Sequence, residues 1–239
     1  MNIRSRFSVL AMLLITAACS TAILATPTLE PTIALPTIDP QILEDELFRT
    51  FVIVPEESKA SYTVEEEFLA GALRPLGIDA GFNTAFGWTR NIQGQLSLNL
   101  NKVPPQIGES FFVVELRSLS SDQDRRDEMI QRQFLESNLF PLAEFVVTAI
   151  DNFPSEAQEG QVINFILIGD MTIREITHPF TFEVEAILEN GMLTGTAIGL
   201  LTMTDFGFDP PSIAGILTVS DPAIITLEFT MKETIANPQ

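Results

Sequence analysis

The sequence predicts a mainly β protein in which antiparallel strands are accompanied by one helix. After residue 59, polar and apolar residues alternate with a period of two, which places successive side chains on opposite faces of a sheet. About eight such segments follow one another, separated by Gly, Pro, Asn and Asp, and a single helical pattern interrupts them. The regular strand-helix alternation of parallel sheets is missing. The pattern therefore favours an antiparallel barrel or a sandwich, and it leaves both open.

The composition excludes several classes of function. The chain carries 13 Lys and Arg against 32 Asp and Glu, for a net charge of −19. Such an acidic protein repels a phosphate backbone, so we expect no nucleic-acid partner. With one His and one Cys, the chain cannot assemble a His-rich or Cys-rich metal site, and we expect neither a metal nor a cofactor.

Residues 1–18 are predicted to form a signal peptide. A positively charged start precedes the short apolar stretch 7–15, which is too short to span a membrane. The only Cys, Cys19, follows Ala18 directly, and this resembles the lipobox of bacterial lipoproteins, in which the signal is cut before a Cys that carries the lipid. Thr16 departs from the Leu that lipoboxes prefer. Cleavage elsewhere, a retained anchor and an incidental Cys therefore stay open as alternatives.

The following segment, residues 19–58, is predicted to be a Thr/Pro-rich tether, because prolines every few residues prevent a helix and favour extended chain. Within it, residues 41–51 are compatible with a short helix. The folded domain is expected over 59–233 and a C-terminal tail over 234–239. Lipidation at Cys19 would place an exported protein on the outer face of a bacterial membrane, and without lipidation the protein would be periplasmic or secreted.

The strands are predicted from the alternation. The first covers 61–68. The second, 92–101, shows the clearest division into a polar and an apolar face. Further strands are expected at 110–119, 142–150, 161–173, 179–189, 192–204 and 223–232. The stretch 162–168 is apolar on both faces, so it needs cover on both sides.

The one strong helix pattern begins near Ser121. The segment Ser121–Asp124 resembles a capping box. In this motif the Ser side chain accepts a hydrogen bond from a backbone amide of the first turn, and the acidic side chain accepts one from the backbone amide of the Ser. We expect the helix to run to Pro141 and to cover the apolar strand. Glu128 and Arg132, four residues apart, are expected to form an exposed ion pair on its surface.

Seven short motifs occur in a recognisable order over about residues 59–233. They are Ser61-Tyr62-x-Val64, Gly87-x-Thr89-x-x-Ile92-x-Gly94, Asp124-x-Arg126-Asp127 leading through Phe134-Leu135 to Phe140-Pro141-x-x-x-Phe145, Gly169-Asp170-Met171-Thr172-Ile173, Thr177-His178-Pro179-x-x-Phe182, Asp205-Phe206-Gly207 and Val219-Ser220-Asp221. No single motif is specific, but the ordered set resembles the YceI-like (lipid/polyisoprenoid-binding) family.

The resemblance implies a lipocalin-like antiparallel barrel, often a homodimer, around an elongated apolar cavity for an isoprenoid or other long-chain lipid outside the cytoplasm. It also implies that Asp127, next to Arg126, ties the helix to the barrel rim. The chain departs from the family at Thr202–Thr204, where a basic residue is common, and at Glu175–Ile176 in a turn. Both departures weaken the case for a charged head group such as a diphosphate.

A cavity that retains a long tail needs apolar walls, since each buried CH₂ contributes about 0.8 kcal/mol. Eighteen Phe supply wall material with few polar atoms. Alternation does not say which strand face lines a lumen, so core packing is an equal alternative at each position. The candidate ligand-binding residues are Phe86, Trp88, Arg90, Phe112, Val114, Phe145, Val147, Ile166, Ile168, Phe182, Met203 and Phe206.

These observations predict a non-enzymatic protein that binds, transports or sequesters a long-chain apolar ligand. The alternative is a cell-surface protein-interaction module with a packed β core and no ligand. A hydrolase built on Asp205 and Asp221 ranks last, because any acidic protein offers carboxylate pairs. His178 is expected in an exposed turn rather than as a catalytic base. Arg90 and Arg117 are candidates for a rim cation or for exposed strand charges.

Overall fold

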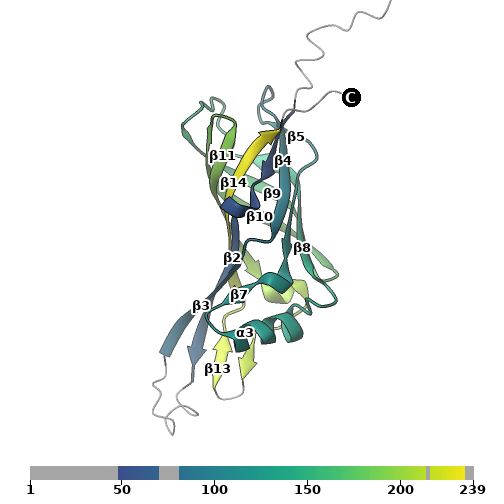
Figure 1. The fold of residues 1–239 in the computed structure, drawn as a ribbon, viewed down its shortest axis with the longest axis vertical. Helices are drawn as coiled ribbons and strands as arrows, with labels where there is room; N and C mark the ends of the chain where they lie inside the picture. The colour runs from purple at the N-terminus through teal and green to yellow at the C-terminus, as the bar shows by residue number, and fades with distance from the viewer. Residues whose placement is uncertain (1–47, 70–80, 214–215, 235–239) are drawn as a thin grey trace, which may run out of the picture. The chain divides into compact units, whose positions relative to one another are not determined.

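The chain forms an antiparallel sheet that closes into a barrel. The computed structural model describes residues 48–69, 81–213 and 216–234. In order around the eight-stranded barrel, the strands are β1 (Arg49–Ile53), β4 (Ile92–Asn99), β6 (Phe111–Glu115), β8 (Leu142–Asp151), β9 (Val162–Ile173), β10 (Ile176–Glu189), β11 (Met192–Thr202) and β14 (Pro222–Thr234) (Figure 1). The barrel closes because β14 pairs with β1 as well as with β11. The predicted mainly β, lipocalin-like barrel is confirmed.

The long strand β14 divides one of its edges between two partners. Its first half pairs with β2 (Lys59–Phe68), and its second half pairs with β1. β2 pairs with β3 (Gly81–Thr89) from Ala60 to Phe68, and the part of β2 that continues past β14 also pairs with β13 (Leu217–Val219) (Figure 1). The short strands are β5 (Gln106–Ile107), β7 (Ser120–Ser121) and β12 (Ser212–Ile213), and the 3₁₀ turns are Pro55–Glu57, Leu116–Ser118 and Met203–Phe206.

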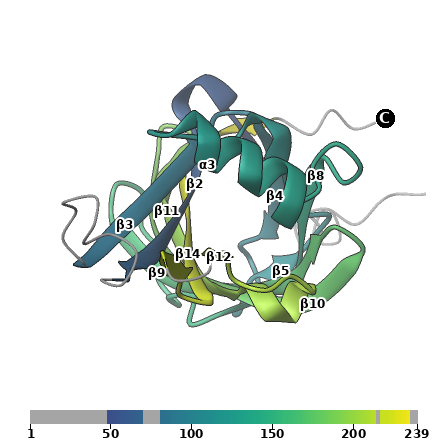
Figure 2. The ribbon, with the colours of Figure 1, turned by 90° about the horizontal axis from the view of Figure 1, so that it is seen from below.

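One helix lies across the end of the barrel at which β2 and β3 project (Figure 2). It consists of α3 (Asp124–Met129) and a π-helical turn over Ile130–Phe134. The predicted capping box is wrong, because the N-cap is Gln123 and no side chain caps the helix. Ser121 lies instead in β7, where its backbone N–H donates to both carboxylate oxygens of Asp127 at 2.9 Å. Asp127 thus ties the helix to the sheet through β7, which pairs with β3.

Two further expectations about the helix need correction. It ends at Phe134 rather than at Pro141, because the chain turns at Glu136, whose φ of 45° lies in the left-handed region. It also leaves the outer face of β9 open, where Val162 is 53% exposed. The expected ion pair between Glu128 and Arg132 is present at 3.1 Å, with both side chains exposed.

Two strands were not predicted: β3, which pairs with β2 outside the eight-stranded ring, and the barrel strand β1. β3 mixes polar and apolar residues without clear alternation, and β1 lies inside the segment assigned to the tether over 19–58. The possible helix over 41–51 is a strand from Arg49 onward, and its first part lies outside the described residues. Phe51 and Ile53 of β1 are 1% and 6% exposed. The barrel therefore begins at Arg49, before the expected boundary at 59.

Candidate functional site

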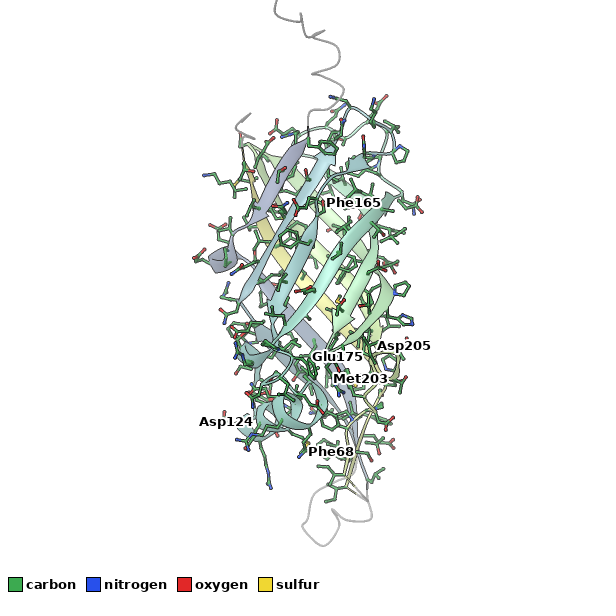
Figure 3. The ribbon with its side chains drawn as sticks, turned by 90° about the vertical axis from the view of Figure 1, so that its right-hand side faces the viewer. Phe68, Asp124, Phe165, Glu175, Met203 and Asp205 are labelled. Atoms are coloured by element: carbon green, nitrogen blue, oxygen red, sulfur yellow. The ribbon has the colours of Figure 1, made fainter. Side chains whose placement is uncertain are left out.

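Three cavities lined by described residues follow one another along the barrel. The largest, of about 550 Å³, lies under α3 and reaches the ends of β9, β11 and β14. A central void of about 20 Å³ lies deeper, and a cavity of about 240 Å³ lies at the opposite end, against β1 and the chain after β8. In Figure 3, Met203 and Phe68 of the largest cavity lie toward the end that carries α3, and Phe165 of the smaller cavities lies in the other half.

The walls of the largest cavity are mainly apolar. Residues of six strands meet side chains of the helix there, because the period-two alternation turns every second residue of a strand to the same face. Representative wall residues are Val64, Phe134, Ile173, Leu201, Met203 and Ile225. Such a surface gains free energy by taking up an apolar molecule from water.

A buried ion pair stands in this apolar wall. Glu66 of β2 faces Arg126 of α3, with Nε–Oε1 and Nη2–Oε2 distances of 3.2 Å and side-chain exposures of 6% and 12%. Asn83 donates to Glu66 at 3.1 Å, and Arg126 also donates to Asp122 and to the Ser121 hydroxyl. Burial lowers the pKa of Arg126, but the hydrogen bonds to Glu66 and Asp122 raise it more, so the guanidinium stays charged. Its donors are already engaged with these partners.

Tyr62 adds a buried hydroxyl to the same wall. Its Oη is inaccessible to water and has no hydrogen-bond partner among the described residues. The ring lies flat against Gly87 on β3, where a Cβ would come within 2.4 Å of the ring, so only Gly fits at that position. Burial, helped by the negative charge of Asp127, raises the pKa of Tyr62 to about 12. The phenol is therefore neutral at physiological pH.

Comparison with known proteins agrees with this architecture. A family model described as the YceI-like domain matches residues 51–231. The chain belongs to the YceI-like family. The sequence resemblance is thereby confirmed, over a match that includes most of β1.

Two solved structures resemble this YceI-like chain in fold. BcnA from Burkholderia cenocepacia is 14% identical, with a TM-score of 0.53, over 74% of this chain and 98% of BcnA. A polyisoprenoid-binding domain from Saccharophagus degradans, implicated in plant cell wall breakdown, is 10% identical, with a TM-score of 0.51, over 74% of this chain and 99% of that domain. No curated protein matches. At these identities the two structures show the fold alone.

Seven of the predicted ligand-binding residues lie inside the YceI-like barrel or against its core. Met203 lines the largest cavity. Phe112, Phe145 and Phe182 line the central void. The others pack in the core without lining any of the three cavities: Val147, Phe206 and the half-buried Val114.

The remaining five lie on the outer face, so their placement in a cavity wall is corrected. Phe86 and Trp88 are 42% and 40% exposed, while their neighbours in β3 turn inward. Ile166 and Ile168 lie on the outer side of β9, between inward-facing buried residues. Arg90 is exposed and donates to the carbonyl of Glu56 at 2.9 Å. Alternation identifies two faces but does not say which one is the lumen.

The other candidates stay outside the cavities. Arg117 is exposed and pairs with Glu115 at 2.9 Å. Asp221 accepts hydrogen bonds from the backbone and hydroxyl of Thr204, so it holds a 3₁₀ turn. His178 is exposed within β10, rather than in a turn. In the described residues, no group of His, Cys, Asp and Glu is arranged to hold a metal ion.

None of the helices in the described segments has the length and apolar character that a membrane crossing needs.

Sequence reasoning missed the polar part of the site. Glu66 alternates in phase with Tyr62, Val64 and Phe68, so it lies on the apolar face of the strand. An acid on an apolar face indicates a buried charge that needs a partner, and this signal was present in the sequence. Its partner Arg126 belongs to a family motif. The pairing itself joins residues 60 positions apart, which period and spacing do not reveal.

Proposed function

We propose that this YceI-like protein binds a long-chain apolar ligand in the cavity under α3 and carries or sequesters it without chemical change. The ligand class is a polyisoprenoid, an isoprenoid quinone or a fatty-acid-like amphiphile. The observation that carries the proposal is the apolar cavity of about 550 Å³ inside the barrel. The polyisoprenoid-binding domain that shares this fold supports the same ligand class.

The arrangement of polar groups suggests how the ligand lies. Gln123, Arg125 and the Glu66–Arg126 pair line the cavity on the helix side, whereas the strand ends inside the barrel contribute apolar residues. We infer that the head group lies next to α3 and that the tail points along the barrel. A ten-carbon tail would contribute roughly 8 kcal/mol by burial, before the cost of ordering it. Because Glu66 neutralises Arg126, this buried pair adds no net charge to the head-group end of the cavity.

Filling the cavity tests this function. Ala223 is 4% exposed and lines the cavity, whereas the next residue, Ile224, is 44% exposed on the outer face. We expect Ala223→Phe to lower the amount of co-purifying apolar lipid at least tenfold, because the new ring occupies the space of the tail. Ile224→Phe is the matched control and should keep the wild-type lipid content. The lipid is measured by organic extraction and mass spectrometry of protein from a bacterial host.

The proposal is withdrawn if the wild-type protein yields no apolar species and takes up no added prenol or fatty acid. Equal lipid content in Ala223→Phe and wild type would place the ligand elsewhere.

We further propose that the protein is exported and held to the outer face of a bacterial membrane through a lipid on Cys19. Residue 19 lies outside the described residues, so the sequence carries this step. The intact mass of the purified full-length product provides the check. Loss of residues 1–18 with acyl mass on Cys19 is expected, and an unmodified Cys19 would leave a periplasmic or secreted protein.

The proposed partners include a second copy of the chain. On the outer face, Leu200, Ile224, Thr63 and Phe86 are direct neighbours across four adjacent strands. Leu200 is 63% exposed and Ile224 is 44% exposed. We call these four residues the outer row. Three of them are exposed apolar side chains, and Thr63 between Ile224 and Phe86 is half-buried. Exposed apolar side chains gathered in this way are common at protein interfaces.

A further inference from the structure

A packed layer separates the largest cavity from the rest of the lumen. On β9, Ile173 lines the largest cavity and Leu167 lines the central void, while Met171, between them, lines neither and is 6% exposed. On β11 the same order runs from Leu201 through Gly199 to Ala197. Two strands thus place a closed layer at the same depth.

Phe180 of β10 fills this layer. It is 7% exposed and lines none of the three cavities. Its ring lies against Gly199 so closely that a Cβ there would come within 2.4 Å of Cε1. The ring packs edge-on against Phe182 at 4.9 Å between centroids, and Phe182 packs in the same way against Phe145 at 5.0 Å. These three rings therefore pack against one another, and Phe180 fills the space beside Gly199.

The layer limits the space available to a tail that enters beside α3. A methylene group fills about the space of one water molecule in the liquid, ~30 Å³, so the cavity of about 550 Å³ holds about 18 carbon atoms. The central void of about 20 Å³ and the far cavity of about 240 Å³ lie behind Phe180. A longer tail would have to displace the ring or remain outside.

We propose that Phe180 is a length-determining residue, which restricts the ligand to apolar tails of about 18 carbon atoms, close to four isoprene units. This inference rests on the proposed function and specifies its ligand. The ring fills the packed layer behind the cavity wall, and Gly199 is the position that leaves space for the ring there. Chains of many isoprene units are excluded from the closed barrel.

The test is competitive uptake from an equimolar ladder of linear prenols, from farnesol upward, by the full chain stripped of lipid. Bound species are identified by mass spectrometry. Wild type should retain prenols up to about four isoprene units and bind the next longer ones at least tenfold less. Phe180→Ala frees about the volume of a benzene ring, ~150 Å³, so its cutoff should move longer by about one isoprene unit.

Two further variants make the result specific. Phe153→Ala removes a ring from the far cavity, where Phe153 packs against Phe165 at 5.4 Å, and should leave the cutoff unchanged. Leu201→Phe adds volume on the near side of the layer and should move the cutoff shorter. Leu201→Phe adds side-chain volume, whereas Phe180→Ala removes it and leaves a cavity. The proposal can therefore be tested with Leu201→Phe even if Phe180→Ala does not fold.

The outcomes separate the two proposals. A wild type that binds all prenol lengths equally, or a folded Phe180→Ala and a Leu201→Phe that both keep the wild-type cutoff, overturns the role of Phe180 while ligand binding stands. A wild type that takes up neither prenols nor fatty acids overturns the proposed function itself, and the length limit with it.

Discussion

At the scale of single residues, Tyr62 is the side chain whose chemistry the fold changes most visibly. It is the only Tyr in the chain, and its hydroxyl is buried without a partner among the described residues. An unsatisfied buried hydroxyl costs about 1–3 kcal/mol. The ring, packed on Gly87, keeps its apolar body in the cavity wall, which offsets part of that cost.

Tyr62 should make stability fall at high pH. Its pKa is near 10 in the unfolded chain and about 12 in the folded one. Its contribution is therefore complete below pH ~10 and is lost as the pH rises toward ~12, because only the unfolded chain then loses the proton readily. The expected loss is up to about 2 kcal/mol after allowance for partial exposure. It should be absent in Tyr62→Phe.

Urea unfolding on both sides of this pH range measures the effect. Because the chain has no other Tyr, tyrosinate absorbance of the native protein reports this group directly. Native titration at the ordinary pKa of about 10 would show that the hydroxyl is not buried.

The residue scale also shows where sequence reasoning stopped. Alternation and motif neighbourhood placed Met203 and Phe182 inside, but the same reasoning placed Ile168 and Trp88 inside as well. A shift of one residue exchanges the two faces of a strand, and apolar residues occupy both faces here. Only the closed sheet decides which face is the lumen.

At the scale of elements, β1 contributes more to the barrel than its five residues suggest. It fills the place between β4 and β14, and it buries Phe51 and Ile53. The bidentate pair from Arg49 to Glu233, with an Nε–Oε1 distance of 2.6 Å, joins its start to the end of β14. Without β1, both neighbours would present unpaired edges.

Deleting β1 should open the barrel. A chain over 48–239 is expected to unfold cooperatively, whereas a chain over 59–239 loses the burial of Phe51 and Ile53, about 1.5–3 kcal/mol each, and should aggregate through its free edges. Urea denaturation and light scattering compare the two. As a control, Arg49→Ala should cost at most about 1 kcal/mol, because the pair is partly exposed. Equal stability of the two chains would contradict the closing role.

Physical causes explain which strands and helix ends the sequence predicted correctly and which it did not. Long alternating strands such as β9 and β10 were predicted nearly at their observed bounds, since period two is strongest over many residues. β1 has only five residues, which is too few for a period-two alternation to be recognised. The helix start was misplaced because Ser121, a good cap by type, is used as a strand residue. Tertiary pairing overrode local preference there.

At the scale of the whole molecule, charge and the outer row act against each other. A net charge of −19 on each copy opposes self-association. The outer row is free of acids, and Lys59 lies near its Phe86 end, with Nζ 5.8 Å from the ring centroid. Glu183 lies beyond its other end, paired with Ile198 next to Leu200. Lys59 is already paired with Glu228 at 3.0 Å, so a two-fold contact would depend on the apolar side chains of the outer row.

Leu200→Lys should therefore convert a homodimer into a monomer, because it puts an unpaired charge into the apolar contact. Light scattering during size-exclusion chromatography measures the mass. Added salt should strengthen the wild-type dimer by screening the net charge. The matched control is Val162→Lys, an exposed apolar position on β9, and it should remain dimeric. A monomeric wild type at micromolar concentrations would rule the interface out.

The molecule-wide features were the least accessible to sequence reasoning. The ordered motifs identified the family, and the family implied the barrel. The closed layer at Phe180 depends on the registers of β9, β10 and β11 together, and no pattern within one strand contains that information.

The shared edge of β14 has a consequence for how the chain reaches its native state. β14 is the last strand of the described residues, yet β1, β2 and β11 all pair with it, and closure brings Arg49 to Glu233 across 184 positions. During synthesis the first two of these strands must wait for nearly the whole chain before their partner emerges. Contacts of such separation form slowly, so the barrel of the nascent protein stays open, with unpaired strand edges, until β14 is free to pair.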